Sequence, residues 1–333
     1  MSEVLEPFVT SVGAHVLVFV LGTIFGSFAN VCIFRWPPSE EHPRGRSVVV
    51  PGSHCGSCGQ PVKWYDNIPM VSYLVLRGRC RACKVEFSPR YLLVEGLAGL
   101  LFVAAYHHVA ILVHAGDPIE FRLFRFAILA AFLLVLVIIA FIDLDHQLIL
   151  DKITYPAIPI FYALGLCLPE NTWRTGLVGA VVGYGLIRLV ADGYYFLTRR
   201  HGLGYGDGKL LAMVGALWGW QAVITALFVG SLVGSIVGVS AIVWARRRDR
   251  DSSSAGTDSA MTSEDMGTSD PDETLHEAGT AERPDEETAA PPPLRHVAVP
   301  FGPFLAVGAV FYIFTASWLH VVMARAFAGY PPV

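Results

Sequence analysis

Long apolar segments separated by short polar connections make up most of the chain. A helix that crosses a bilayer needs about 20 mainly apolar residues, and suitable runs lie at 12–34, 92–113, 124–142, 152–169, 175–197, 209–221, 222–245 and 301–324. This pattern predicts an all-α polytopic membrane protein with about eight transmembrane helices. The composition agrees, because 53% of the residues are hydrophobic and only 16% are charged. No small-residue cleavage site follows the first run, so we expect it to stay in the mature protein.

The distribution of Lys and Arg predicts the orientation, since loops rich in these residues stay in the cytoplasm. Residues 35–91 carry nine of them. The loops expected on the opposite side hold only Arg122, Arg125, Arg174 and Arg325. We therefore expect an outward N-terminus and a cytoplasmic loop at 35–91.

One polar segment, 249–297, differs from the rest of the chain. It is rich in Ser, Thr, Ala and Pro and holds 13 of the 28 acidic residues but only three basic ones. A segment with so few large apolar side chains cannot bury enough surface to offset chain entropy. We expect a disordered acidic linker, and the formal net charge of -4 comes from this segment alone.

Two C-x-x-C pairs lie in the predicted cytoplasmic loop: Cys55 with Cys58, and Cys80 with Cys83. Four thiolates from two such pairs can surround one metal ion tetrahedrally, as in zinc ribbons. The spacing therefore predicts a closed, structural zinc site. A pair of disulfides is the alternative, which the reducing cytoplasm disfavours.

Carboxylates also lie at the ends of apolar runs, in FIDLDHQLILD at 141–151 and GLGYGDGKL at 202–210. Between Asp143 and Asp207 the chain is expected to cross the bilayer twice, so both carboxylates should lie at the same face. Two neighbouring carboxyl groups in a partly desolvated site share a proton, and the ionised one acts as a base toward water. We therefore hypothesise an aspartic protease pair. The glycines beside Asp207 are expected to permit a sharp turn and a close approach of substrate.

Other polar residues have simpler interpretations. Asp145 and Asp151 are expected to cap helices or mark the membrane interface. Arg188 and Asp192, four positions apart, should neutralise each other on one helix face. Lys209 could tune the charge of Asp207 or mark the interface.

Two other classes of function are open from these residues alone. A transporter or channel could use intramembrane aspartates as ion or proton sites, which predicts acidic groups near the bilayer midplane and inverted repeats. A non-catalytic membrane scaffold would explain the zinc loop but would leave the two aspartates without a task. We expect a lipid bilayer as the environment and no nucleic-acid partner.

The chain resembles the prepilin leader peptidases, which are peptidase and N-methyltransferase enzymes of type IV pilus and type II secretion systems. The similarity covers nearly the whole chain apart from 249–297. It rests on GSFANVCIFRWP at 26–37, the segment 53–99 with its four cysteines, the two aspartate motifs, and VPFGPFLAVG at 299–308. By this match the catalytic aspartates of the family fall on Asp143 and Asp207.

The resemblance implies a bacterial inner-membrane enzyme that removes the leader of prepilins and pseudopilins at the cytoplasmic face. It also implies that the new N-terminal residue is methylated with S-adenosylmethionine, an activity that composition and spacing do not indicate. A peptidase without this second activity is the alternative. The sequence assigns no residue to the methyl donor, although Glu95 could face either the cysteine loop or a methyl-donor pocket.

The expected organisation has five parts. Residues 1–34 form the first transmembrane helix, and 35–91 the cytoplasmic four-cysteine zinc loop, which the resemblance associates with methyl transfer. The peptidase core with both aspartates occupies 92–248. The acidic linker follows at 249–297, and 298–333 hold the last transmembrane helix and the C-terminus.

Overall fold

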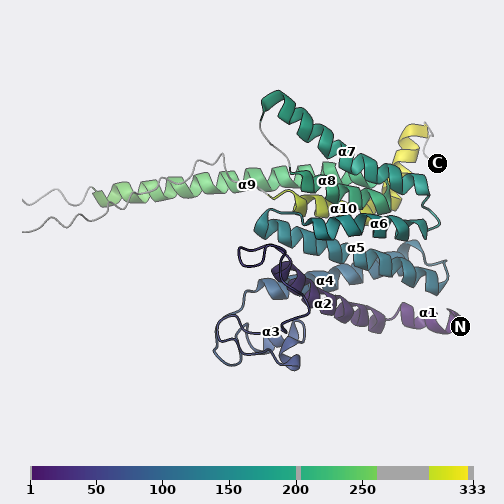
Figure 1. The fold of residues 1–333 in the computed structure, drawn as a ribbon. Helices are drawn as coiled ribbons and strands as arrows, with labels where there is room; N and C mark the ends of the chain where they lie inside the picture. The colour runs from purple at the N-terminus through teal and green to yellow at the C-terminus, as the bar shows by residue number, and fades with distance from the viewer. Residues whose placement is uncertain (1, 200–203, 261–299, 329–333) are drawn as a thin grey trace, which may run out of the picture. The chain divides into compact units, whose positions relative to one another are not determined.

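The computed structural model describes residues 2–199, 204–260 and 300–328. Every regular element in this part of the chain is a helix (Figure 1). The helices are α1 Ser2–Val9, α2 Val12–Arg35, η1 Trp64–Asn67, α3 Val71–Val75, α4 Arg90–Tyr106, the π-helical η2 His107–Val113, α5 Ile119–His146, α6 Asp151–Leu166, α7 Trp173–Thr198, α8 Tyr205–Trp218, α9 Trp220–Ala260 and α10 Gly302–Ala328. The chain divides into two compact units: unit 1 is Met1–Val233 with Pro300–Val333, and unit 2 is Gly234–Val299.

Five of the helices are long and apolar enough to cross a membrane: Val12–Arg35, Arg90–Val113, Ile119–His146, Trp173–Thr198 and Trp220–Trp244. Each coincides with a run that the hydrophobic pattern predicts.

The other three predicted runs also form helices, namely α6, α8 and α10. However, α6 has 16 residues and α8 has 14, which is about 24 and 21 Å of helix against a hydrocarbon core of about 30 Å. The apolar part of α10 is also short, at Gly302–Ala316. The described residues therefore confirm an all-helical chain with several membrane spans, while the count of eight is not confirmed.

Helix α5 lies at the centre of unit 1, where α2, α4, α6 and α10 contact it (Figure 1). Its large apolar side chains are almost completely buried, among them Phe132, Leu133, Leu136 and Ile139. Lipid tails are as apolar as these side chains, so close packing rather than removal from water holds such helices together.

Glycines bring the helices of unit 1 into their closest contacts. A Cβ on Gly179 of α7 would lie 2.1 Å from the carbonyl oxygen of Gly215 in α8. A Cβ on Gly26 of α2 would lie 2.8 Å from the Cα of Glu95 in α4. No side chain fits at either crossing, which is the small-residue packing common between membrane helices. The second crossing places Glu95 directly against α2.

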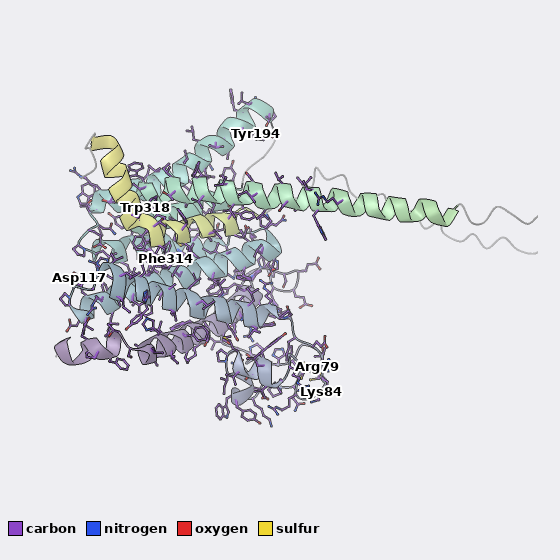
Figure 2. All side chains as sticks on the ribbon, turned by 180° about the vertical axis from the view of Figure 1, so that it is seen from behind. Arg79, Lys84, Asp117, Tyr194, Phe314 and Trp318 are labelled. Carbon is purple, nitrogen blue, oxygen red and sulfur yellow. The ribbon has the colours of Figure 1, made fainter. Side chains whose placement is uncertain are left out.

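A network of paired charges occupies the end of unit 1 opposite the cysteine loop. Figure 2 shows Asp117 at this end and Arg79 and Lys84 of the cysteine loop at the other. The buried Arg122 forms an ion pair with Glu6, and the buried Arg125 forms one with Glu170. Buried guanidinium groups need such partners, because an unpaired charge away from water is costly.

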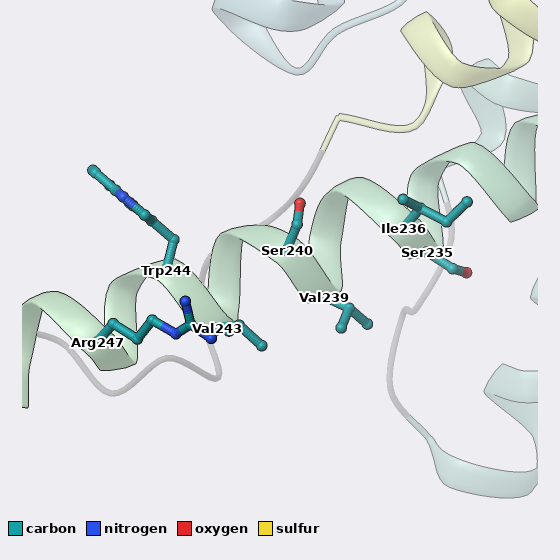
Figure 3. Close-up of a pocket in the computed structure, with 7 residues that line it drawn as sticks. All are labelled: Ser235, Ile236, Val239, Ser240, Val243, Trp244 and Arg247. Atoms are coloured by element: carbon teal, nitrogen blue, oxygen red, sulfur yellow. The ribbon is translucent and has the colours of Figure 1, made fainter.

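The described part of unit 2 is the stretch of α9 from Gly234 to Ala260. A hollow of about 590 Å³ lies along this helix between Ser235 and Arg247 (Figure 3). Its lining comes from one helix and contains neither a carboxylate nor a thiol, so none of the expected chemistry lies there. The predicted linker 249–297 begins in the last turns of α9, and residues 261–299 lie outside the described part of the chain.

Candidate functional site

Two tight turns of the same construction carry the four cysteines. In the first, the N–H of Cys55 donates to the carbonyl of Gln60 at 2.9 Å. The second repeats this bond between Cys80 and Val85, also at 2.9 Å. Each turn folds its C-x-x-C segment back on itself, so both sulfur atoms of a pair point to the same side, as in a zinc knuckle.

The residue after each second cysteine has left-handed backbone geometry. Gly59 has a φ of +70° and Lys84 a φ of +62°. Glycine adopts this conformation without strain, whereas a residue with a Cβ pays roughly 1–2 kcal/mol. The second turn therefore keeps the same left-handed geometry although Lys84 is strained in it.

The two turns bring all four thiols together. The sulfur atoms of Cys55, Cys58, Cys80 and Cys83 lie within 4.8 Å of one another, and the Cys55 and Cys83 sulfur atoms are 3.7 Å apart. Four sulfurs about 2.3 Å from a zinc ion would be separated by about 3.8 Å in an ideal tetrahedron. All four cysteines are free thiols. The cluster therefore fits a tetrahedral metal ion and not a pair of disulfides.

Backbone N–H groups prepare two of the thiols for metal binding. Those of Cys58 and Ser57 donate to the sulfur of Cys55 and lower the pKa of its thiol to about 6. Those of Cys83 and Ala82 lower the pKa of Cys80 in the same way. The thiolate is the form that binds metal, so the turns stabilise the ligand form before any ion arrives.

Asp143 lies in the last turn of α5 and is 5% exposed. One of its oxygens, Oδ2, accepts a hydrogen bond of 2.9 Å from the backbone N–H of Gly302 at the start of α10. A Cβ on Gly302 would lie 2.7 Å from this oxygen, so only glycine allows the approach. The last helix thus holds the carboxylate in place across 159 positions of sequence.

Asp207 lies in the first turn of α8 and is 8% exposed. A helix N-terminus favours a carboxylate because of its exposed N–H groups and its dipole. Lys209, two residues beyond Asp207, pairs with Asp151, and Gly206 packs on Ile149. Asp207 therefore lies at the same end of the bundle as Asp143, as the crossing pattern predicts.

The glycines around Asp207 that the structure describes make close packing contacts. None of Gly204, Gly206 and Gly208 has a positive φ, and Gly202 lies outside the described residues. A Cβ on Gly206 would lie 2.9 Å from the Cβ of Ile149, and one on Gly208 would lie 3.3 Å from Ile187. The glycines let the start of α8 pack tightly against the segment before α6 and against α7.

The other charged residues near the pair form structural contacts. Asp145 forms an ion pair with Arg90 at the start of α4. Asp151 opens α6 and forms an ion pair with Lys209. Arg188 and Asp192 pair with each other at 3.1 Å, as expected. The C-cap of α5 is Gln147 and the N-cap of α6 is Leu150, so neither Asp145 nor Asp151 caps its helix. Each is instead held by an ion pair, and Lys209 contacts Asp151.

The cysteine loop and the aspartate pair lie at the same end of unit 1. The chain leaves the loop at Arg90, which contacts Asp145 two residues beyond Asp143. It enters the loop after Trp36, whose carbonyl accepts a hydrogen bond from Lys152 at the start of α6. Both ends of the loop are therefore tied to the aspartate end of the bundle.

Comparisons with known proteins agree with this geometry. Residues 20–109 match the model of the bacterial peptidase A24 N-terminal domain, and residues 130–239 match that of the type IV leader peptidase family. The first match contains the cysteine loop, and the second contains Asp143 and Asp207. No solved structure matches the chain significantly.

Three curated relatives carry the name prepilin leader peptidase/N-methyltransferase. The protein of Myxococcus xanthus is 38% identical over 67% of this chain. The matched region covers 62% of that relative's own length. The protein of Aeromonas salmonicida is 37% identical over 68% of this chain and 81% of its own length. That of Neisseria gonorrhoeae is 34% identical over 71% of this chain and 84% of its own. The chain therefore belongs to the type IV leader peptidase family.

Proposed function

We propose that this chain is a membrane aspartic endopeptidase that removes the leader peptide of type IV prepilins and type II secretion pseudopilins. The observation that carries the proposal is the presence of two buried carboxylates, Asp143 and Asp207, at one end of the helix bundle. They come from helices far apart in the sequence of a leader peptidase family member. The names of the curated relatives support the choice of substrate.

The pair supplies the groups that peptide hydrolysis needs. Two carboxyl groups close together in a desolvated site hold one proton between them. The ionised carboxylate takes a proton from water, which attacks the scissile carbonyl, while the protonated one polarises the carbonyl oxygen. The backbone N–H of Gly302 donates a hydrogen bond to Oδ2 of Asp143 and keeps that side chain in one orientation. The other oxygen is left for the water.

The second proposed activity is N-methylation of the newly exposed N-terminal residue with S-adenosylmethionine. The relatives' names support it. The metal in the cysteine cluster is proposed to be zinc with a structural role, since four thiolates fill a tetrahedral shell and leave no open position for a substrate. Bound zinc would fix the two turns relative to each other.

The proposed setting is the bacterial inner membrane, with an outward N-terminus and the cysteine loop in the cytoplasm. Eight crossings, counting α6, α8 and α10, give this topology. The proposed parts are the helix at 1–34, the zinc loop at 35–91, the peptidase core at 92–248, the acidic linker at 249–297 and the final helix at 298–333. The contact of Gly302 with Asp143 supports counting the final helix as part of the peptidase core.

Two rival functions account for less of the arrangement. An ion-coupled transporter would place acidic groups in the middle of its helices, whereas Asp143 ends α5 and Asp207 begins α8. A membrane scaffold would need the metal loop but not the buried carboxylate pair.

The test is mass spectrometry of a prepilin incubated with the purified full chain in lipid, with and without S-adenosylmethionine. The proposal predicts loss of the leader in both reactions and one added methyl group only when S-adenosylmethionine is present. Cleavage without methylation would restrict the chain to proteolysis. A substrate left intact, across several candidate leaders, would contradict the proposal and favour the scaffold.

A further inference from the structure

A cavity of about 810 Å³ lies between the C-terminal half of α2, the cysteine loop and the start of α4. This volume is in the range of small-molecule sites, roughly 300–1,000 Å³. Its lining combines aromatic side chains with one deeply buried carboxylate: Phe34, Tyr73, Phe87, Tyr91 and Glu95. The aspartates of the proposed peptidase site do not line it, so it is a separate compartment at the same end of unit 1.

Glu95 is the distinctive group of this cavity. Glu95 is buried, with only 8% of its surface exposed. The oxygen Oε2 accepts a hydrogen bond of 2.7 Å from the backbone N–H of Met70, and the side chain of Ser27 in α2 is a further partner. A carboxylate offers about four acceptor sites, so these bonds leave capacity for a ligand.

Within the described part of the chain, no Lys, Arg or His side chain lies within ion-pair distance of Glu95. Burying an ionised carboxylate without a cation is costly. The other acid of the lining, Asp66, is already occupied, because Arg81 donates to both of its oxygens. Glu95 is therefore the acid of this cavity that still lacks a cation.

The backbone beside Glu95 is held in an uncommon conformation. Met70 has a φ of +58°, although it is not glycine. Such backbone costs about 1–3 kcal/mol and persists where the surroundings impose it, often at ligand sites. The hydrogen bond from Met70 to Glu95 clamps the segment before α3 onto α4 and so builds one wall of the cavity.

Cationic groups lie on the α2 side of the same cavity. Arg35 and Arg46 line it, and the guanidinium of Arg35 donates to the carbonyl of Ser47 at 3.0 Å. Guanidinium groups bind carboxylates, and flat aromatic side chains such as Tyr73 and Tyr91 stack on heteroaromatic rings. A matching ligand has a cation for Glu95, a carboxylate for the arginines and a flat ring for the tyrosines.

We infer that this cavity binds S-adenosylmethionine, with Glu95 accepting the positive charge of its sulfonium and amino groups. This inference rests on the proposed methyltransferase function and gives that function a place in the fold. S-adenosylmethionine has the three required parts: a cationic centre, a carboxylate and an adenine ring. Arg90 begins α4 beside Asp145, and Glu95 follows five positions later, so one helix joins the peptidase end to the methyl-donor site.

The transfer balances without a further reactant. The new N-terminal ammonium first loses a proton to water and becomes a neutral amine. The bond between sulfur and the methyl carbon breaks as the bond between nitrogen and that carbon forms. The sulfonium becomes a neutral thioether, and the product is a methylammonium group on the pilin. A carboxylate beside the sulfonium favours binding of the cationic donor over the neutral thioether product.

The first experiment measures binding of tritiated S-adenosylmethionine to the purified full chain in detergent. Glu95→Gln is compared with Glu120→Gln, which makes the same chemical change at an exposed position at the start of α5. Loss of a hydrogen-bonded charge partner should raise Kd about ten- to a hundredfold for Glu95→Gln. Glu120→Gln should bind like the unaltered chain, and both variants should still cleave a prepilin. An unchanged Kd in Glu95→Gln would overturn the inference.

A second measurement does not depend on how the variant folds. Ultraviolet cross-linking of tritiated S-adenosylmethionine to the unaltered chain, followed by peptide mapping, should place the label within residues 27–35, 42–62, 66–79 or 87–95. Label found only in α5 to α10 would overturn the location of the site, while methylation by the same preparation would leave the proposed function standing. A chain that cleaves prepilin but neither binds nor methylates would refute the methyltransferase proposal together with this inference.

Discussion

Replacement of Gly302 by Ala perturbs the proposed catalytic pair through a single methyl group. The new Cβ would lie 2.7 Å from Oδ2 of Asp143, whereas ordinary contacts begin at 3.4 Å. Backbone of α10 and the carboxylate would have to separate by about 0.7 Å to restore ordinary contact. The 2.9 Å hydrogen bond from the Gly302 N–H would lengthen toward the distance at which it is lost.

The expected size of the effect follows from that bond. A hydrogen bond to a charged group is worth about 1.5–3 kcal/mol. If it holds Asp143 in its working orientation, its loss lowers the rate of leader cleavage about ten- to a hundredfold. A displacement of under 1 Å is enough for such losses in enzymes whose reacting groups must be aligned.

Gly308→Ala on the same helix is the matched control. A Cβ there would lie 2.3 Å from the carbonyl oxygen of Ala226 in α9, which is not a proposed catalytic group. Overpacking of this kind costs about 1–3 kcal/mol of stability. We expect Gly308→Ala to lower Tm while the folded fraction keeps its specific activity, and Gly302→Ala to lose kcat with a smaller change in Tm.

The assay combines thermal unfolding in detergent with the initial rate of prepilin cleavage per folded molecule. A Gly302→Ala variant that is folded and cleaves at the rate of the unaltered chain would refute the role given to this contact. Equal losses of activity in both variants would also refute it, because helix packing alone would then explain the effect.

Three further predictions concern the cysteine loop and the acidic linker. Cys55→Ser removes one of four thiolates and should lower the zinc content below one ion per chain, as measured by elemental analysis, whereas the exposed Cys167→Ser should not; an unchanged content in both would remove the zinc assignment. Gly59→Ala should destabilise the metal-loaded loop by about 1 kcal/mol. There is space for the added Cβ, since no atom lies within 4 Å of it, but a residue with a Cβ disfavours the φ of +70°. If the variant and the unaltered chain lost metal to a chelator equally slowly, this reasoning would be wrong. Deletion of 251–290 should leave leader cleavage nearly normal, and a strong loss of activity would show that the segment is more than a tether.

The helices were predictable because a membrane-spanning chain has few backbone structures available to it. Backbone groups in lipid must be satisfied within a helix, so apolar runs locate helices directly, and all eight predicted runs coincide with helices. Their number of crossings was less predictable, because α6 and α8 are shorter than a bilayer needs. Short buried helices and spanning helices have the same apolar composition.

The cysteine cluster and the placement of Asp143 and Asp207 at one end of the bundle followed from local spacing and from the parity of crossings. The contacts that position these groups did not. The bond from Gly302 to Asp143 joins residues 159 positions apart, and that from Met70 to Glu95 depends on an unusual backbone angle. The packing role of Gly206 was also hidden, since a glycine pattern does not distinguish a sharp turn from a close contact.

Leader cleavage is proposed to need Asp143 and Asp207 together. Mass spectrometry of prepilin incubated with Asp143→Asn and with Asp207→Asn tests this requirement, since each change keeps the size of the side chain and removes the carboxylate. We expect an uncleaved leader with both variants, while each still methylates a pilin supplied without its leader, which shows that the chain is folded. Full leader cleavage by either variant would contradict the assignment of the catalytic pair.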